Sequence, residues 1–500
     1  MTVINKILVA NRGEIALRII RTCRDMGIRT VAVYSEADME SPHLHAAEES
    51  VFIGLAPSPE SYLDIGKLIA AAKETAADAI HPGYGFLSEN AEFARKCIDE
   101  GLIFIGPPPE SIDLMGDKTA ARKLMARANV PFPPGTQNHL ETIEEAGKAA
   151  EQIGFPVLVK AAAGGGGKGM RIIEDRENFT SGIKAARSEA RNAFGDDRIY
   201  IEKYFNSPKH IEIQIISDAH GNVCHLFERE CSIQRRHQKV IEEAPSTVLD
   251  QEMRSRMAES AIKAAEACNY IGAGTVEFLV DREMNYYFIE MNTRLQVEHP
   301  VTELITGYDL VELQIRVARG EELPFQQDDI KISGHAIECR IYAEDPEENF
   351  LPAVGRLARH RPPAGPWIRV DAGVEEGQEI SIHYDPMISK LCVHAPDRAM
   401  AVSRMLRALA EYEIAGCRTT IPFCSYVMRH PDFADGNYNT AFVRDKYQPD
   451  KLYSEAGDEP DIVAIAAAFV SENDPEEKSV RDNSAKPSGT EPDNWWNNRR

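Results

Sequence analysis

The stretch "FIEMNTRLQVEHPVTE", residues 288–303, has a polar side chain at every second position from residue 290 to residue 298. In an extended chain these positions point to one face. That face carries, in order, Glu290, Asn292, Arg294, Gln296 and Glu298. A half-exposed edge strand is the simplest interpretation. The order of carboxylate, amide, guanidinium, amide and carboxylate instead indicates a metal-binding end that leads into an anion-binding end, with a possible base beyond it.

The preceding stretch, "GTVEFLVDREMNYYFIEMN", predicts a hairpin. If Asp281 pairs with Tyr286 across a four-residue loop, Glu277 lies directly opposite Glu290. Facing like charges are destabilising. A hard divalent cation would relieve the repulsion, and Mg²⁺ takes few carboxylates while leaving positions for substrate phosphates. Asn292 could complete the oxygen set; two solvated glutamates are the alternative.

The chain cannot remain extended through this whole stretch. At about 3.3 Å per residue, positions 290 to 298 of a straight strand would span roughly 26 Å, too far for one reaction centre. We therefore expect the chain to leave the strand soon after Asn292.

A glycine-rich segment, "AGGGGKGM" at residues 163–170, lacks the spacing of a Walker A loop. It formally contains GxGxxG, but "MRIIED" follows it and predicts a strand where a dinucleotide-binding turn needs a helix. A glycine loop between two strands can cover a polyphosphate with its backbone N–H groups. Lys160 and Lys168 flank it, which favours a phosphate flap over a plain flexible hairpin.

A basic cluster occurs in "FERECSIQRRHQKVIEEAP", residues 227–245, of this acidic chain. Its cations are Arg235, Arg236, His237 and Lys239. Adjacent cations are how a local anion site is built. A solvated loop is the alternative.

The elements that must position these residues follow from the hydrophobic pattern. "KILVA", the helical pattern of "NRGEIALRIIRTCRDMG" and "RTVAVYS" predict a βαβ unit, and further alternation up to about residue 115 indicates a mostly parallel sheet covered by helices. "MGDKTAARKLMARANVPFPPG" predicts a helix and a domain junction. Residues 210–303 predict antiparallel strands with one helix at about 251–269, and residues 331–445 a unit rich in short strands and turns.

Composition and charge bound the class of protein. The chain has 500 residues, 43% hydrophobic content and a net charge of -23, which argues against general nucleic-acid binding. Its nine scattered cysteines form no CxxC pair and predict reduced thiols in a cytoplasm. No signal peptide or membrane span is apparent, so we expect a soluble protein. Residues 448–500 have the low hydrophobicity of an acidic, mobile tail.

Taken together, these motifs resemble biotin carboxylase, the ATP-grasp subunit of biotin-dependent carboxylases, from residue 1 to about residue 447. The resemblance rests on "ANRGEIALRI", "HPGYGFLSEN", "LMGDK", "AGGGGKGM", "CSIQRRHQKVIEEAP", "GAGTVEF", "FIEMNTRLQVEHPVTE", "GHAIECRIYAEDP" and "YDPMISKL". It implies an α/β and α+β fold: a Rossmann-like N-terminal domain (1–115), an ATP-grasp domain (116–330) with a mobile glycine-rich lid (about 133–204), and a β-rich C-terminal domain (331–447).

The resemblance also implies residue roles. ATP would be bound by Lys118, Lys160, Gly166, Gly167, Glu202, Lys203, Tyr204, Phe205, His210, His237, Glu277 and Glu290. Mg²⁺, for which Mn²⁺ could substitute, would be held by Glu277, Glu290 and Asn292. Bicarbonate would be bound by Lys239, Arg294, Gln296, the Val297 backbone and Glu298, with Glu298 as the base, and Arg340 would stabilise the biotin enolate. Cys231 and Tyr84 are placed only near the site.

The implied reaction is ATP- and bicarbonate-dependent carboxylation of biotin. Because no Met-Lys-Met biotinylation site and no carboxyltransferase region appear, we expect a separate biotin carboxyl carrier protein and separate carboxyltransferase subunits. The family usually forms homodimers. Acetyl-CoA carboxylase, and hence fatty acid biosynthesis, is the commonest setting; "EPDIVAIAAAFV" resembles tails from two-subunit pyruvate carboxylases and some acyl-CoA carboxylases, which leaves the acceptor open.

Two other functions are compatible with parts of the pattern. An ATP-dependent carboxylate–amine ligase shares the ATP-grasp fold but would lack the block that contains Arg340. A non-catalytic nucleotide-binding subunit would show damage among the site residues, and the sequence shows none.

Overall fold

The computed structural model describes residues 2–136, 139–161, 170–236 and 238–452. The chain divides into two compact units, Met1–Tyr447 and Gln448–Arg500. In the second unit the description covers residues 448–452, with a 3₁₀ turn at Pro449–Lys451. The predicted mobile tail and the "DIVAIAAAFV" segment therefore lie outside the described residues, apart from this turn.

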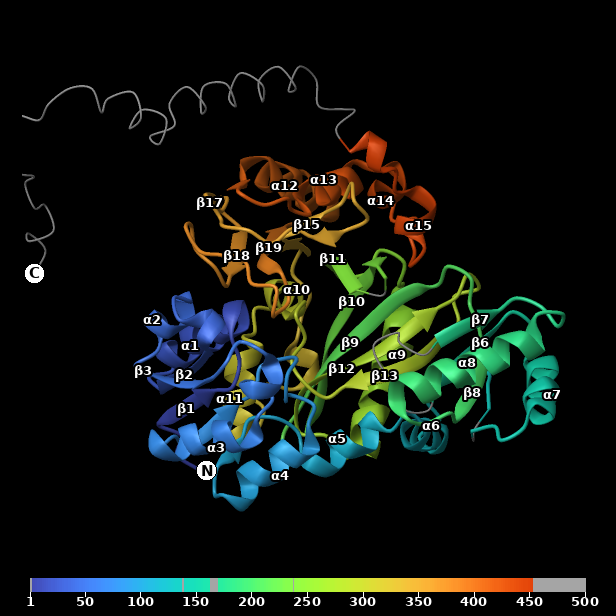
Figure 1. Ribbon diagram of the computed structural model, residues 1–500, viewed down its shortest axis with the longest axis horizontal. Helices are drawn as coiled ribbons and strands as arrows, with labels where there is room; N and C mark the ends of the chain where they lie inside the picture. The colour runs from blue at the N-terminus through green and yellow to red at the C-terminus, as the bar shows by residue number, and fades with distance from the viewer. Residues whose placement is uncertain (1, 137–138, 162–169, 237, 453–500) are drawn as a thin grey trace, which may run out of the picture. The chain divides into compact units, whose positions relative to one another are not determined.

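The N-terminal part is a five-stranded parallel sheet in the order β3-β2-β1-β4-β5 (Figure 1, blue). Its strands are β1 (Lys6–Val9), β2 (Arg29–Ser35), β3 (Glu49–Gly54), β4 (Ala79–His81) and β5 (Ile103–Phe104). The helices here are α1 (Gly13–Asp25), α2 (Pro42–Ala46), α3 (Ile65–Glu74), α4 (Ala91–Asp99) and α5 (Pro109–Gly116). The predicted βαβ unit and mostly parallel sheet are confirmed.

Both faces of this sheet are buried, as parallel sheets require. Ile7 and Val9 of β1 pack into one hydrophobic cluster, and Leu8 between them packs into another on the opposite face. The alternation follows from the strand period of two. Helix α1 ends before Gly27, which has φ +69° and donates its N–H to the Arg24 carbonyl.

A smaller three-stranded antiparallel sheet, in the order β7-β6-β8, lies in the predicted lid. It consists of β6 (Val157–Ala161), β7 (Met170–Ile173) and β8 (Ile199–Lys203), with helices α6 (Lys118–Arg127), α7 (Ile143–Ile153) and α8 (Phe179–Phe194) in the same part of the chain. The expected strands on both sides of the glycine loop are confirmed. The loop itself, with Gly166 and Gly167, lies outside the described residues.

The largest sheet is antiparallel and has the order β13-β12-β9-β10-β11-β14-β19-β18. Its strands are β9 (Lys209–Ser217), β10 (Val223–Arg235), β11 (Gln238–Ala244), β12 (Gly272–Val280), β13 (Tyr286–Asn292), β14 (His335–Tyr342), β18 (Ile368–Ala372) and β19 (Met387–Ala395). Strands β14, β18 and β19 belong to the predicted C-terminal domain, yet they extend the sheet of the predicted central domain through the pairing of β11 with β14. The predicted boundary between residues 330 and 331 thus falls within one continuous sheet.

Helices and short strands complete the first unit around this sheet. The helices are α9 (Gln251–Ala267), α10 (His299–Thr306), α11 (Leu310–Ala318), α12 (Arg398–Glu411), α13 (Ile421–Arg429), α14 (Pro431–Ala434) and α15 (Phe442–Lys446). Two short pairs are β15 (Glu344–Asp345) with β16 (Leu351–Pro352), and β17 (Arg359–Arg361) with β20 (Glu413–Ala415). No helix in the described part of the chain is long and apolar enough to cross a membrane.

The β12–β13 hairpin brings Glu277 opposite Glu290, as predicted, but by a different path. The expected pairing of Asp281 with Tyr286 is wrong, because Tyr286 pairs with Val280. A β-bulge between the pairs at Glu277 and Phe278 then shifts the register by one residue. The loop is one residue longer than predicted, and the bulge restores the pairing.

Candidate active site

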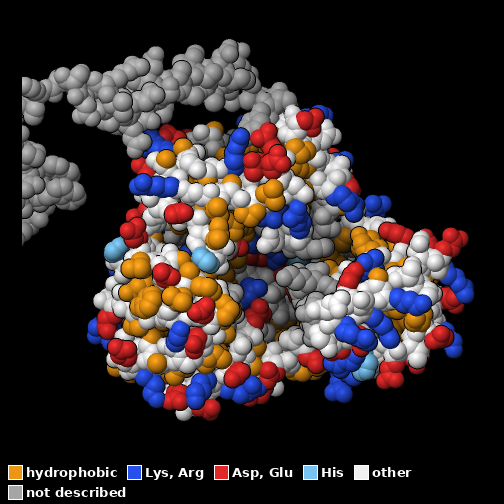
Figure 2. All heavy atoms as spheres, in the orientation of Figure 1, with side chains coloured by type: hydrophobic (Ala, Val, Ile, Leu, Met, Phe, Trp, Pro, Cys, Tyr) orange, Lys and Arg blue, Asp and Glu red, His pale blue; other side chains and the backbone are white. Residues whose placement is uncertain are grey.

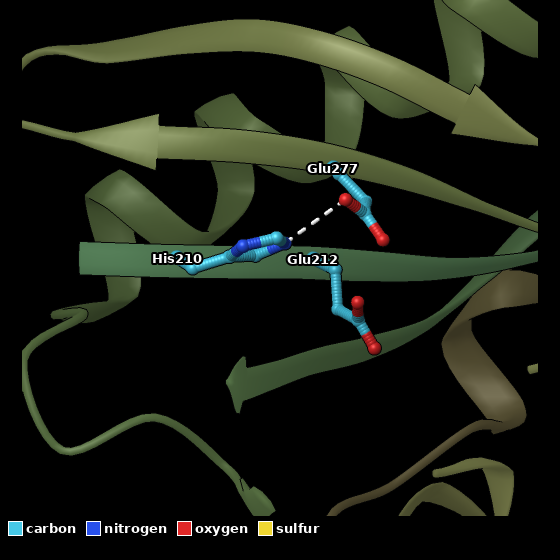
Figure 3. A group of neighbouring side chains, drawn as sticks. All are labelled: His210, Glu212 and Glu277. Carbon is cyan, nitrogen blue, oxygen red and sulfur yellow. Dashed lines mark ion pairs between the residues drawn. The ribbon is translucent and has the colours of Figure 1, made fainter. Parts of the chain in front are cut away.

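Lys239 of β11 is the centre of the candidate site. Its ammonium donates hydrogen bonds to carboxylates of Glu212 on β9, of Glu277 on β12 at 2.9 Å, and of Glu298 at 2.6 Å. Glu212 and Glu277 are direct partners on neighbouring strands, so their carboxylates meet on one face (Figure 3). Burial lowers the pKa of Lys239, but the three carboxylates outweigh it and hold that pKa well above its ordinary value.

Glu298 is 2% exposed and is held between two cations. One oxygen accepts from Lys239, and the other accepts from Arg340 Nη2 at 2.9 Å. Arg340 comes from β14 and also donates from Nε to Glu242 at 2.7 Å. Burial raises the pKa of Glu298, yet Lys239 and Arg340 bring it well below its usual range. The carboxylate is therefore ionised, which is the state that a proton acceptor must have before it takes up a proton.

Glu277 is surrounded by donors. Its Oε1 accepts from Lys239, from Asn292 at 2.8 Å and from Gln296 at 2.9 Å. Its Oε2 lies 3.0 Å from His210 Nε2, the ion pair drawn in Figure 3. Burial alone would raise the pKa of Glu277, but Lys239 and His210 keep it well below the usual value.

The side chain of Glu290, opposite Glu277, has no hydrogen bond or ion pair among the described residues. Burial and the charge of Glu277 raise its pKa, against attraction from Lys118. An unpartnered carboxylate facing another carboxylate fits a hard divalent cation, and Asn292 adjoins the pair. Two other groups of side chains have their possible ligand atoms close together: His210, Glu212 and Glu277, and Glu212, Cys231 and Glu298. Both groups surround Lys239, and its ammonium already neutralises their carboxylates.

The residues from 293 to 298 form a loop between β13 and α10, because β13 ends at Asn292. The expectation that the chain leaves the strand there is confirmed. Arg294 donates from Nε to Glu89, which precedes α4, at 2.9 Å, and from Nη2 to Asn292 at 3.1 Å. The sequence predicts that Arg294 faces the anion site with the other polar residues. In the structure its guanidinium is turned toward Glu89 of the N-terminal part, and its role in binding an anion stays a prediction.

Gln296 connects the loop to the sheet. Its amide nitrogen donates to Glu277, and its oxygen accepts from Arg229 at 2.7 Å. Arg229 is fully buried and also donates to Glu212. The Val297 carbonyl accepts from Lys390 at 3.0 Å. Each polar residue from 292 to 298 is therefore held by a partner outside the loop.

The residues predicted for ATP are divided between two sheets: Lys160, Glu202 and Lys203 lie on β6 and β8, whereas His210, Glu277 and Glu290 lie on β9, β12 and β13. Lys160 on β6 lies 2.5 Å from Glu202 on β8, and Lys203 donates to the carbonyls of Gly154 and Phe155 at 3.0 Å. The Phe205 ring stacks on Tyr287 at 4.6 Å. The Tyr204 N–H donates to the Pro156 carbonyl, and Lys118 begins α6. His237 lies outside the described residues.

The surface of the molecule has a hollow on the face drawn in Figure 2. Figure 2 shows the surface hollowed between the N-terminal elements and the lid, with side chains of both charges at its rim.

Comparison with known proteins identifies the chain's relatives. Family models match for the biotin carboxylase N-terminal domain at residues 3–112, the carbamoyl-phosphate synthase L chain ATP binding domain at 117–326, and the biotin carboxylase C-terminal domain at 338–445. A biotin carboxylase of Nostoc sp. is 53% identical over 441 residues, which are 88% of this chain and 99% of that protein. The chain belongs to the biotin carboxylase family.

Two further relatives show how far the similarity extends. The methylcrotonoyl-CoA carboxylase subunit alpha of Rattus norvegicus is 53% identical over 88% of this chain, which spans 62% of that longer protein. The biotin carboxylase domain dimer of Hydrogenobacter thermophilus 2-oxoglutarate carboxylase, in complex with MgADP, ADP and bicarbonate, superposes with a TM-score of 0.86 at 48% identity, covering 91% of this chain and 99% of that one. The fold class expected from the sequence is thereby confirmed.

Several residues of the candidate site were not expected from the sequence. Glu212, Arg229 and Glu242 bind the predicted residues Lys239, Gln296 and Arg340 from neighbouring strands. Glu212 could have been found, because "HIEIQ" places His210, Glu212 and Gln214 at alternate positions, the same pattern as in residues 290–298. The partnership of Glu89 with Arg294 spans 205 residues and has no local signal.

Proposed function

We propose that this chain catalyses the ATP-dependent carboxylation of biotin by bicarbonate. The observation that carries this proposal is the placement of Glu298, an ionised carboxylate clamped between Lys239 and Arg340 in a chain of the biotin carboxylase family. Removal of a proton from bicarbonate needs a base beside an ammonium that binds the anion. Stabilisation of a biotin anion needs a second cation close by.

In the first step, Lys239, Arg294, Gln296 and the Val297 backbone bind bicarbonate, and Glu298 accepts its proton. The bicarbonate oxygen attacks the γ-phosphorus of ATP, giving carboxyphosphate and ADP. Phosphoryl transfer needs alignment and charge stabilisation more than covalent help, and the cations of this site supply both. Magnesium, bound by Glu277, Glu290 and Asn292, would neutralise the phosphate oxygens.

In the second step, carboxyphosphate breaks down to CO₂ and phosphate. The phosphate removes the proton from the biotin ureido nitrogen, and that nitrogen attacks CO₂. Arg340 stabilises the enolate oxygen that forms, because its guanidinium is fixed by Glu242 and Glu298 at 2.7 and 2.9 Å. Lys118, Lys160, Glu202, Lys203, Tyr204, Phe205 and His210 would hold ATP, together with Gly166, Gly167 and His237.

We propose that the biotin is attached to a separate carrier protein. The carboxyl group would then pass from this biotin to an acceptor on a carboxyltransferase subunit. A homodimer is supported by the dimer of the Hydrogenobacter relative. A reducing compartment such as the cytoplasm agrees with the nine cysteines, all of which are free.

The test is ATP cleavage by the purified protein with and without bicarbonate and free biotin. The proposal expects phosphate release that requires bicarbonate and rises with free biotin. ATP cleavage that instead follows an added amine would indicate a carboxylate–amine ligase, and no cleavage under any condition would indicate a non-catalytic subunit.

A further inference from the structure

The loop of residues 293–298 has an uneven pattern of backbone hydrogen bonds. The carbonyls of Leu295, Gln296, Val297 and Glu298 all accept hydrogen bonds. The N–H groups of residues 294–298 have no acceptor within the described ranges of the chain. Consecutive unpaired N–H groups in a largely buried loop are a binding site for an anion, because buried donors are otherwise costly.

Two of these carbonyls are held by side chains that the reaction itself does not use. His299 is fully buried, and its Nδ1 lies 2.7 Å from the Gln296 carbonyl oxygen. Burial and the nearby charge of Lys390 keep the pKa of His299 well below its ordinary value, so the ring is neutral. A neutral ring nitrogen this close to a carbonyl must carry the hydrogen and donate it.

The Val297 carbonyl is held by Lys390 of β19. This ammonium is fully buried, donates to Val297 O at 3.0 Å, and lies 3.2 Å from Glu14 of α1 and 3.9 Å from Asp371 of β18. Lys390 therefore connects the loop to the N-terminal sheet layer and to the far edge of the large sheet. Its position is fixed by carboxylates on both sides.

Fixing a carbonyl also fixes the N–H of the same peptide unit. The peptide is planar and trans here, so its N–H points away from its carbonyl oxygen. The contact of His299 with Gln296 O aims the Val297 N–H, and the contact of Lys390 with Val297 O aims the Glu298 N–H. We propose that His299 and Lys390 are positioning residues that hold these two N–H groups in place for bicarbonate, an inference that rests on the proposed function.

A matched pair of variants at His299 gives the cleanest test, because the neutral ring can be replaced without leaving a charge unpaired. His299→Leu removes the side-chain donor and leaves the His299 backbone N–H, which also donates to the Gln296 carbonyl at 3.3 Å, whereas His299→Asn retains a side-chain N–H near the Nδ1 position. We expect His299→Leu to raise the KM for bicarbonate about tenfold, the value of one lost hydrogen bond, and His299→Asn to stay within about threefold of wild type. The KM for ATP should stay within about twofold in both.

Lys390→Gln gives a second measurement, with Lys209→Gln as its control. Lys209 also donates to a backbone carbonyl, Gly436 at 3.2 Å, and lies 3.6 Å from the buried Glu230, but it does not contact the 293–298 loop. We expect both variants to lower the temperature of thermal unfolding, whereas only Lys390→Gln raises the KM for bicarbonate.

The inference is overturned if His299→Leu and Lys390→Gln lower the unfolding temperature and leave the KM for bicarbonate at the wild-type value. It is also overturned if the constants for ATP and bicarbonate rise together, or if His299→Asn is no better than His299→Leu. Wild-type protein without bicarbonate-dependent ATP cleavage would instead refute the proposed function, and this inference with it.

Discussion

Replacing Lys239 by Met should destabilise the protein and abolish turnover. The ammonium lies 2.9 Å from Glu277 and 2.6 Å from Glu298, and its side chain is 11% exposed. At an effective dielectric constant of about 20, each contact is a gross attraction of about 6 kcal/mol. Desolvation offsets most of this, and removing one partner of a buried ion pair costs about 3–5 kcal/mol because the other charges stay buried.

The expected loss of unfolding free energy is therefore about 3–5 kcal/mol, although Met fills nearly the same volume. Turnover should fall by at least about 10²–10³, the usual effect of removing one well-placed charge donor. A double variant, Lys239→Met with Glu212→Gln, separates the two effects. It neutralises one of the three carboxylates that contact Lys239, so part of the stability should return, whereas turnover should not.

The measurements are calorimetric unfolding and bicarbonate-dependent ADP release for the wild type, both single variants and the double variant. The coupling between the two sites follows from the double-mutant cycle. Wild-type stability in Lys239→Met, combined with turnover within tenfold of wild type, would refute the view that this ammonium organises the site.

Three further outcomes are expected. Arg294→Ala should lower bicarbonate-dependent turnover by about 10²–10³ and leave the far-ultraviolet circular dichroism unchanged, and unchanged turnover would contradict its role. Glu290→Gln should raise the Mg²⁺ concentration that half-saturates ATP cleavage, because one anionic ligand is lost; an unchanged Mg²⁺ titration would place the metal elsewhere. Burial raises the pKa of Glu242 to about 7, so this carboxyl binds more protons in the folded state than in the unfolded chain, where its pKa is about 4.5. Its stabilising contribution is present below about pH 4.5 and is lost as pH rises to about 7, a change of about 3 kcal/mol that should be missing in Glu242→Gln when unfolding free energy is measured against pH.

Local sequence patterns predicted the helices and strands of this fold. One predicted pairing, Glu277 opposite Glu290, is correct only because two differences from the prediction cancel each other. The apolar run of β1 and the helical period of α1 correspond to buried positions that the structure shows. The opposition of Glu277 and Glu290 was predicted from a hairpin of the wrong length, and it holds because a β-bulge absorbs the extra residue. A bulge depends on packing of both strands, which no residue spacing reveals.

Contacts between segments that are far apart in the chain could not be predicted from the sequence. The polar alternation from residue 290 to residue 298 identified residues that meet around Lys239, but it did not indicate that Arg294 would turn to Glu89 or that Lys390 would hold Val297. These partners come from the N-terminal part and from β19, so their proximity depends on the tertiary fold. The resemblance to biotin carboxylase supplied roles for single residues, and those roles stay predictions.

The most direct test of the central claim is transfer of labelled carbon to biotin. Purified protein is incubated with ATP, Mg²⁺, [¹⁴C]bicarbonate and free biotin, and acid-labile label in carboxybiotin is measured beside ADP. We expect ATP-dependent labelling of biotin that is lost in Lys239→Met and Arg294→Ala. Formation of ADP in the presence of bicarbonate and biotin, with no label in biotin, would contradict the proposed carboxylation of biotin.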